Sequence, residues 1–177
     1  MQDPTSDLAP KPVKLGDIIT RSVLEARWSV VLTALGVPWL YEAKCWNLSS
    51  GRYLPDFWLP RERVWVEIKP AGIPIDDRRY RDLAAAGETL VLIAGSPWPG
   101  DYSATLYTQG RVERNMRLAL GRVDHRELWL TRVQDCFSYP LSRSVNRDYL
   151  PLFDCYMLNQ AFRAARNALF EVVEERA

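Results

Sequence analysis

Histidine and cysteine are scarce in this chain, and their scarcity excludes several kinds of site. The 177 residues include one histidine, His125, and three cysteines, Cys45, Cys136 and Cys155, none of them in a CxxC pair. This supply makes a multi-histidine metal site, a histidine-activated nucleophile, a four-cysteine zinc site and a disulfide framework hard to build. We therefore expect the chemistry of this protein to rest on carboxylates and lysine.

Long apolar runs and a strong net charge are also missing. No stretch of about 18 apolar residues is present, and the first 14 residues are polar and contain proline, unlike a signal peptide. We expect no membrane span and a cytoplasmic protein. The formal net charge of +1 gives no general sign of a nucleic-acid binder, so any such function must rest on local clusters of charge.

The length and composition predict one folded domain. A chain of 177 residues that is 47% hydrophobic fills one core. We expect residues 1–14 to form a flexible N-terminal arm, residues 15–100 to form the core, and residues 101–177 to form a C-terminal helical extension packed on that core within the same domain.

Hydrophobic periodicity predicts an α/β (α+β) fold, a mixed sheet of about four to five strands flanked by helices. Apolar residues at helical spacing predict a first helix from about Thr20 to Leu35, ended by Gly36. Short apolar runs and turn residues predict a three-stranded meander followed by a crossover helix and a buried strand. The expected segments are strands Trp39–Trp46, Tyr53–Leu59 and Val64–Lys69, helix Pro74–Ala86, strands Thr89–Ala94, Ala104–Thr108 and Leu128–Leu130, and a terminal helix Pro151–Glu174.

The hairpin that ends the meander is predicted to bring two acids together. A four-residue turn at 60–63 puts Leu59 opposite Val64, and counting back along both strands puts Asp56 opposite Glu67. Because side chains alternate along a strand, one face would be core and the other a site lined by the acids and by Trp58 and Trp65.

Two carboxylates opposite each other in a sheet repel, and a cation would offset the repulsion. Carboxylate oxygens are the ligands that Mg²⁺ prefers in proteins. Lys69 lies on the same predicted face as Asp56 and Glu67, where it would orient a water or neutralise charge on a phosphate.

These residues carry a family resemblance. Pro55-Asp56, a ten-residue gap and Glu67-Ile68-Lys69 resemble the PD-(D/E)XK nuclease signature, over roughly residues 18–95. The resemblance implies a restriction-endonuclease-like core and Mg²⁺, replaceable by Mn²⁺, bound by Asp56, Glu67 and the backbone carbonyl of Ile68. It is closest to small phage or prophage endonucleases of the junction-resolving, transposon-end or homing type, which implies DNA as substrate, a homodimer and a bacterial or phage-infected cytosol.

Glu25 has two interpretations. It matches the first-helix glutamate of the PD-(D/E)XK family, which implies a catalytic role and possible metal binding. Ser22-x-x-Glu25 is equally a capping-box pattern, in which the glutamate only satisfies backbone N–H groups at the helix start. Several exonuclease-like members of the family carry a glutamine shortly after the lysine. Here Pro70 follows Lys69 directly and no glutamine is nearby, so the resemblance disfavours an exonuclease.

Further residues are candidates for nucleic-acid contact, each with a structural alternative. The tryptophans would stack on bases or pack in the core, and the arginines would bind phosphates or form a solvated helix face balanced by nearby aspartates. The candidates are Trp58, Trp65, Arg78, Arg79, Arg163 and Arg166.

The sequence thus predicts a metal-dependent DNA endonuclease, an enzyme that hydrolyses phosphodiester bonds, with a protein partner as a possible means of recruitment. Two alternatives stay open. One is a non-catalytic nucleic-acid-binding or structural subunit with the same fold, and the other is an RNA-directed nuclease with the same site.

Overall fold

The computed structural model describes residues 11–120, 128–131, 138–140 and 156–173. Its helices are α1 (Val23–Ala34), α2 (Arg78–Ala85) and α3 (Tyr156–Asn167). Its strands are β1 (Val13–Leu15), β2 (Ile18–Thr20), β3 (Leu40–Tyr41), β4 (Trp46–Leu48), β5 (Gly51–Tyr53), β6 (Phe57–Leu59), β7 (Val64–Lys69), β8 (Leu90–Gly95), β9 (Tyr102–Thr108), β10 (Arg111–Leu120), β11 (Leu128–Thr131), β12 (Ser138–Pro140) and β13 (Glu171–Val172).

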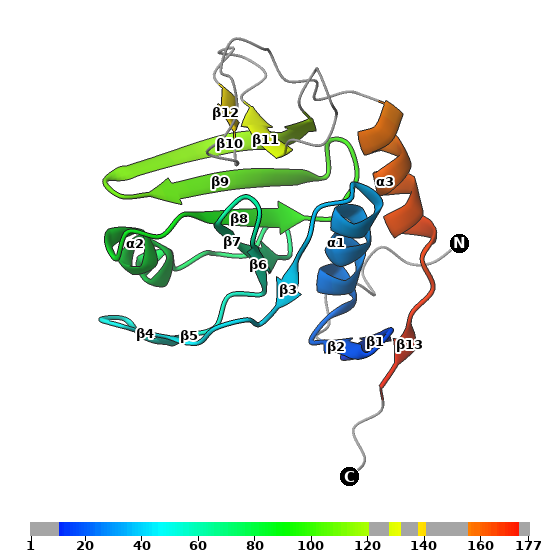
Figure 1. The fold of residues 1–177 in the computed structure, drawn as a ribbon, viewed down its shortest axis with the longest axis horizontal. Helices are drawn as coiled ribbons and strands as arrows, with labels where there is room; N and C mark the ends of the chain where they lie inside the picture. The colour runs from blue at the N-terminus through cyan, green and yellow to red at the C-terminus, as the bar shows by residue number, and fades with distance from the viewer. Residues whose placement is uncertain (1–10, 121–127, 132–137, 141–155, 174–177) are drawn as a thin grey trace.

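A mixed sheet is the centre of the fold (Figure 1). Its eight strands follow the order β12-β11-β10-β9-β8-β7-β6-β3, in which only β7 and β8 are parallel. The mixed α+β class is confirmed, but the expected four to five strands were too few. The C-terminal extension contains the expected helix, α3, and the expected strands at 104–108 and 128–130, but β9 to β12 also add to the sheet one after another and make it larger than expected.

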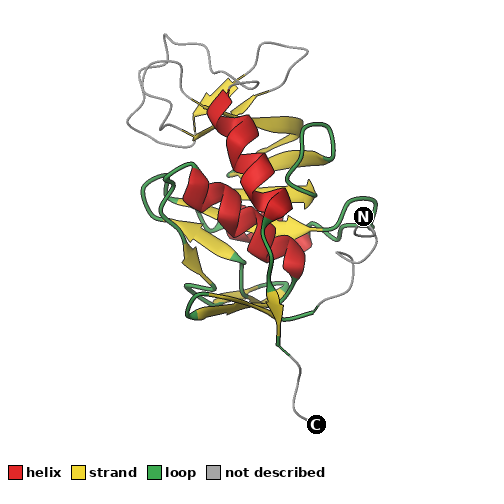
Figure 2. Ribbon diagram, turned by 90° about the vertical axis from the view of Figure 1, so that its right-hand side faces the viewer, coloured by secondary structure: helices red, strands yellow, loops and turns green. Residues whose placement is uncertain are grey.

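Helices cover both faces of the sheet (Figures 1 and 2). Helices α1 and α3 lie against each other on one face, where they bury Phe57, Val66 and Ile68 in the larger core; we call this the α1 face. Helix α2 covers the opposite face, the α2 face, over a second core that contains Trp65 and Leu92. The expected division of the hairpin into one core face and one site face is corrected, because β7 is a central strand covered on both sides and Trp65, on the expected site face, lies in the second core.

The predicted hairpin register is confirmed. Strands β6 and β7 pair antiparallel with Phe57 opposite Val66, Trp58 opposite Trp65 and Leu59 opposite Val64. The predicted meander is only partly formed. Strand β3 pairs with β6 over two residues, and the chain between them leaves the sheet as a separate hairpin, β4–β5, with Leu48 opposite Gly51 at its turn.

The first helix is held at its start and near its middle. The hydroxyl of Ser22 caps its start by accepting a hydrogen bond from the Glu25 N–H, and the indole N–H of Trp28 donates to the Gly95 carbonyl at 2.9 Å. The helix begins later than Thr20 because that residue pairs with Val13 in the small sheet β13-β1-β2. This sheet therefore leads directly into the helix that carries Glu25.

The two end segments differ from expectation. Val13 is fully buried and pairs with Val172, so the predicted arm does not extend to residue 14; residues 1–10 lie outside the described residues. The terminal helix ends at Asn167 because the chain then forms β13, and its predicted first residues, 151–155, also lie outside the description. Within the described residues, no helix is long and apolar enough to span a membrane.

Gly95 is expected to be essential for stability. Its φ is +115°, and an added Cβ would overlap the carbonyl oxygen of Asp101. Gly110, with φ +73° and nothing near its Cβ position, is a matched control. We expect Gly95→Ala to lower the free energy of unfolding in urea by about 3 kcal/mol or more, and Gly110→Ala by about 1 kcal/mol. Equal losses would contradict the steric argument.

Candidate active site

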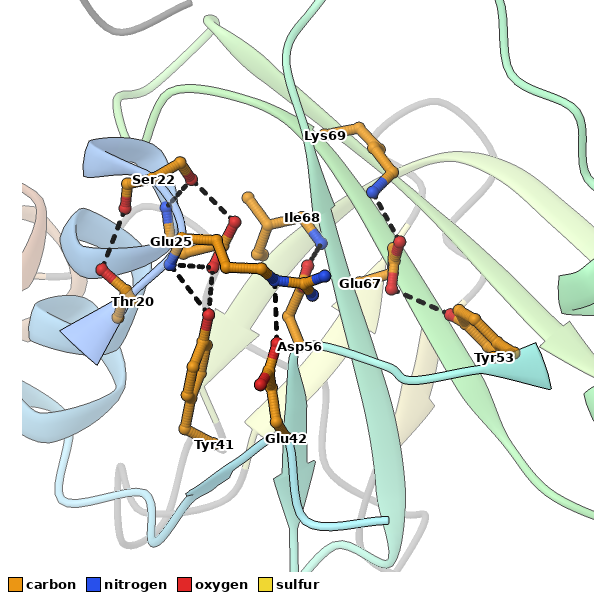
Figure 3. A network of polar contacts seen from close by, with 11 residues as sticks. Thr20, Ser22, Glu25, Tyr41, Glu42, Tyr53, Asp56, Glu67, Ile68 and Lys69 are labelled. Carbon is orange, nitrogen blue, oxygen red and sulfur yellow. Dashed lines mark hydrogen bonds and ion pairs between the residues drawn. The ribbon is translucent and has the colours of Figure 1, made fainter. Parts of the chain in front are cut away.

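Asp56 and Glu67, which we call the acid pair, are both buried, with exposed fractions of 1% and 3%. Asp56 lies just before β6 and Glu67 lies in β7 (Figure 3). The Asp56 carboxylate accepts the Ile68 N–H at 2.7 Å, which extends the contact between the two strands beyond their last backbone pair. The structure therefore brings together the two acids that the register predicted.

Each member of the acid pair has one cation beside it. The Lys69 Nζ lies 2.6 Å from Glu67 Oε1, and the Arg21 Nη2 lies 2.8 Å from Asp56 Oδ1. Lys69 was predicted at this place, whereas Arg21 was missed. Its only signal in the sequence is that it directly precedes the capping residue Ser22. The Arg21 side chain is 55% exposed, so this cation lies at the solvent edge of a buried carboxylate.

Glu25 forms the capping contacts that were its alternative interpretation. The Ser22 hydroxyl donates to Glu25 Oε1 at 2.8 Å, and the Glu25 N–H donates back to the Ser22 hydroxyl at 3.2 Å. Its other oxygen, Oε2, accepts the Tyr41 hydroxyl at 2.7 Å and the Arg21 N–H at 3.2 Å. The carboxylate is also close enough to the acid pair to raise the pKa of Asp56. Capping and an electrostatic role at the site are therefore compatible.

Two tyrosines that sequence analysis missed hold these carboxylates. The Tyr53 hydroxyl donates to Glu67 Oε2 at 2.9 Å, and the Tyr41 hydroxyl donates to Glu25 (Figure 3). Burial, and then the neighbouring carboxylate, raises the pKa of each phenol above its usual value. Both therefore stay protonated donors over the physiological range. The signal for Tyr53 in the sequence was its position, three residues before Asp56.

The acid pair is electrostatically strained. Burial raises the pKa of Asp56 well above its usual value, and the charges of Glu67 and Glu25 raise it further. An ionised Asp56 is stabilised by the Ile68 N–H and by nearby cations. Arg21 and Lys69 are such cations in this structure, and a divalent cation would meet the same need more strongly.

The residues present fit a magnesium ion by their chemistry. Magnesium is usually held by one or two carboxylates, with water and phosphate oxygens as further ligands. The acid pair supplies the carboxylates, and the Ile68 carbonyl points to the same side as the Ile68 N–H that Asp56 accepts. Across the described ranges, no three His, Cys, Asp or Glu side chains form a group that could hold a metal ion.

The arginines predicted to contact nucleic acid differ in their surroundings. Arg78 forms hydrogen bonds to both oxygens of Asp76, which matches the alternative of a balanced helix face. The Arg79 guanidinium lies 5.9 Å from the ring of Tyr53, next to the acid pair. Arg163 and Arg166 are exposed on α3, where Arg166 lies over the Trp98 ring, and no contact in the described part of the chain links them to the acid pair.

The two predicted tryptophans also differ. Trp65 is buried, with an exposed fraction of 4%, and its indole N–H donates to Glu88. Trp58 is half-buried, and the two rings are 4.6 Å apart between centroids. The predicted pairing across the strands is therefore present, but of the two only Trp58 has substantial exposure.

Comparison of the chain with protein-family models, with curated proteins and with solved structures returns no match. The interpretation of the site therefore rests on its residues and their geometry.

Asp56→Asn is expected to stabilise the metal-free protein at neutral pH. Because the pKa of Asp56 is raised, the folded chain binds more protons than the unfolded chain between the usual and the raised value, so its stability falls as pH rises through that interval. Asparagine carries no charge and still accepts the Ile68 N–H. With chelator present, we expect a melting temperature about 3 °C higher than wild type at pH 8, on the order of 1 kcal/mol.

The difference should fall to near zero at about pH 3, where the unfolded carboxyl is mostly protonated. Asp101→Asn, an exposed matched substitution, should leave the melting curve unchanged at both pH values. A variant less stable than wild type at pH 8 would contradict the assignment of strain to Asp56.

Proposed function

We propose that this protein is a metal-dependent DNA endonuclease of the PD-(D/E)XK type. The observation that carries the proposal is a buried acid pair, from adjacent strands, with a lysine 2.6 Å from one acid, in the PD…EXK spacing. We infer that α1, β3, β6, β7, α2 and β8 correspond to the restriction-endonuclease-like core. The confirmed hairpin register and the parallel β7–β8 pair support this inference.

The acid pair and the Ile68 carbonyl would hold Mg²⁺, with Mn²⁺ as a substitute, and Glu25 would support the site from α1. When bound, the ion supplies activation of water and stabilisation of charge on the phosphate. Arg21 is then no longer needed beside Asp56. Its side chain is half-exposed and also pairs with Glu42, so a turn toward a phosphate of the substrate exchanges these carboxylate contacts for a phosphate contact.

The surrounding residues fix the reacting groups. Lys69 is one-third exposed, and its ammonium group is held by Glu67, so it can orient a water molecule and balance negative charge that develops on the phosphate. Tyr53 holds Glu67 from the opposite side and prevents its rotation. Together they keep the water, the carboxylate and the phosphate at fixed positions, which lowers the entropic cost of the reaction.

A purely binding function explains these residues less well. A surface that only binds phosphate gains nothing from two buried carboxylates, because they repel the ligand and raise the cost of folding. The same site is compatible with RNA as substrate, so the two nucleic acids have to be compared directly.

We expect wild-type protein with Mg²⁺ or Mn²⁺ to cut DNA, and Lys69→Ala to be at least about 100-fold slower because an oriented cation is lost from the reacting groups. The assay uses linear duplex, single strand, supercoiled plasmid, flap, four-way junction and matched RNA, each with metal or chelator. Accumulation of nicked or linear plasmid separates cutting of one strand from cutting of two by a homodimer.

Lys14→Ala is the control, since Lys14 is exposed on the small sheet and should keep full activity. The proposal would be contradicted if folded wild-type protein cut none of the substrates, or if Lys69→Ala and Lys14→Ala cut at equal rates. Cutting confined to RNA would retain the site and exclude DNA as the substrate.

Arg21→Ala is expected to bind metal more tightly and to cut more slowly. The guanidinium competes with a cation for Asp56, and a half-exposed ion pair of this kind is worth about 1 kcal/mol, so affinity should rise about fivefold. Terbium luminescence excited through tryptophan, with displacement by Mg²⁺, measures the affinity without substrate. Arg163→Ala, on the exposed side of α3, should leave the metal affinity unchanged. Unchanged or weaker metal binding in Arg21→Ala would contradict the competition.

A further inference from the structure

A pocket of about 450 Å³ lies on the α2 side of the hairpin. The residues that define its chemistry are three tryptophans, two cations and one acid: Trp46, Trp58, Trp65, Lys44, Arg63 and Glu88. We call it the tryptophan pocket. The volume is in the range of sites that bind small ligands or single groups of larger ones.

The pocket is next to the acid pair along the same strands. Trp65 and Glu67 are two residues apart in β7, so their side chains point to the same face, at a spacing of roughly 7 Å along the strand. Trp58 is opposite Trp65 in β6. A chain that placed a phosphate at the acid pair would therefore bring its next groups to the tryptophan pocket.

The tryptophans form a rigid platform. Trp65 packs at 4.6 Å from Trp58, with a tilt of 38°, and at 5.8 Å from Trp46, edge to face. The Trp65 indole N–H is fixed by Glu88 at 3.1 Å. Trp58 packs on Trp65 and is only partly buried, so a flat aromatic group can stack on its exposed part.

Cations lie at the entrance of the pocket. Lys44 is exposed, with its Nζ 3.5 Å from the centre of the Trp46 ring. Arg63 is exposed at the end of the hairpin turn, where φ is +57°, a conformation rare for an arginine. Its backbone N–H closes the turn on the Leu59 carbonyl at 2.8 Å, which fixes where the side chain starts.

We propose that the tryptophan pocket binds an unpaired nucleobase of the nucleic acid that is cut at the acid pair, and this rests on the proposed function. The base stacks on Trp58, its flanking phosphates contact Lys44 and Arg63, and Glu88 accepts a hydrogen bond from an N–H group of the base. The substrate is then one with an unpaired nucleotide beside the cut, such as a single strand, a flap or a junction.

The charges favour this occupant over a protein partner. An apolar peptide or the surface of a second copy would remove Lys44, Arg63 and Glu88 from water without giving them partners, which is costly. A nucleotide combines a flat ring for Trp58 with an anion for the two cations. Stacking also tolerates any base, so this pocket selects unpaired structure more than sequence.

Binding without cutting tests the proposal. Fluorescence anisotropy of short labelled oligonucleotides is measured in chelator, with single-stranded DNA, single-stranded RNA and blunt duplex of matched sequence. We expect Trp58→Leu to weaken binding of the single strands about tenfold while Trp58→Phe, which keeps a ring, loses less than about threefold. Duplex binding should hardly change. The DNA and RNA arms show which backbone is preferred.

The matched control is Trp39→Leu, since Trp39 is also half-buried but packs on Phe57 in the core of the α1 face. It should bind every oligonucleotide as wild type does. Thermal unfolding verifies that each variant is folded. If Trp58→Leu is unfolded, the proposal is tested by the other two variants: Trp58→Phe should bind single strands nearly as wild type does, and Lys44→Ala/Arg63→Ala should bind them more weakly.

The charge at the entrance is tested by that double variant. Because alanine at both positions leaves two phosphates of the oligonucleotide without a cation, the salt dependence of single-strand affinity should become shallower by roughly 1.4 in log–log slope. An unchanged slope overturns the assignment of Lys44 and Arg63 to phosphate binding.

The proposal fails if Trp58→Leu binds single strands as wild type does, or if light scattering shows that Trp58→Leu abolishes self-association, which would make the pocket a subunit contact. Failure of the proposed function gives a different result, because single strands would then bind through Trp58 while no substrate is cut with metal. Cutting of duplex at wild-type rate by Trp58→Leu, with unaltered single-strand binding, would leave the nuclease intact and remove the pocket from it.

Discussion

The repulsion between the buried carboxylates of Asp56 and Glu67 is the constraint on which the surroundings of the site depend. Burial raises the pKa of Asp56, and both neighbouring acids raise it further. The groups around the acid pair are those that reduce this cost: two cations, a tyrosine hydroxyl and the Ile68 N–H. The site is therefore most stable with positive charge in it, which is the electrostatic condition for holding a metal ion and, through it, a phosphate.

The short strand β6 makes this arrangement possible. Its backbone pairing with β7 ends at Phe57 and Val66, so the next β7 N–H that points toward β6, that of Ile68, is satisfied by the Asp56 side chain. The Asp56 carboxylate thus acts as the acceptor that a longer β6 backbone would have supplied. Meanwhile β7 continues, buried on both faces, and delivers Glu67 and Lys69 from a rigid centre of the sheet. Rigid strands are good supports for a site whose groups need fixed positions.

Local patterns in the sequence predicted the elements near the site. The alternation of Phe57, Leu59, Val64 and Val66 set the hairpin register, and helical spacing located α1. Arg21, Tyr41 and Tyr53 were missed because each reaches its partner through a tertiary contact that leaves no period in the sequence. The second core under α2 was missed for a related reason, since a strand with hydrophobic residues on one face and Trp65, Glu67 and Lys69 on the other resembles a half-exposed strand until its covering helix is known.

The larger sheet was also underestimated. Strand β9 was expected at Ala104–Thr108, but β10 contains many polar and charged residues, such as Arg111 and Glu113, which masked its alternation. The hairpin β4–β5 was assigned to the meander because its turn residues, Asn47 to Gly51, separate two apolar runs in either arrangement. Turn chemistry located the chain reversal but not the sheet to which the strands belong.

The pairing of Val13 with Val172 has a consequence for how the protein folds. This contact joins segments from opposite ends of the chain, so closing it costs more chain entropy than forming the hairpins and the β7–α2–β8 crossover, whose partners are near in sequence. We therefore expect the β1–β13 pair to form after the main core. Lys69 belongs to β7, whereas Arg21 lies between β2 and α1, so the two counter-charges of the acid pair come from separate parts of the chain.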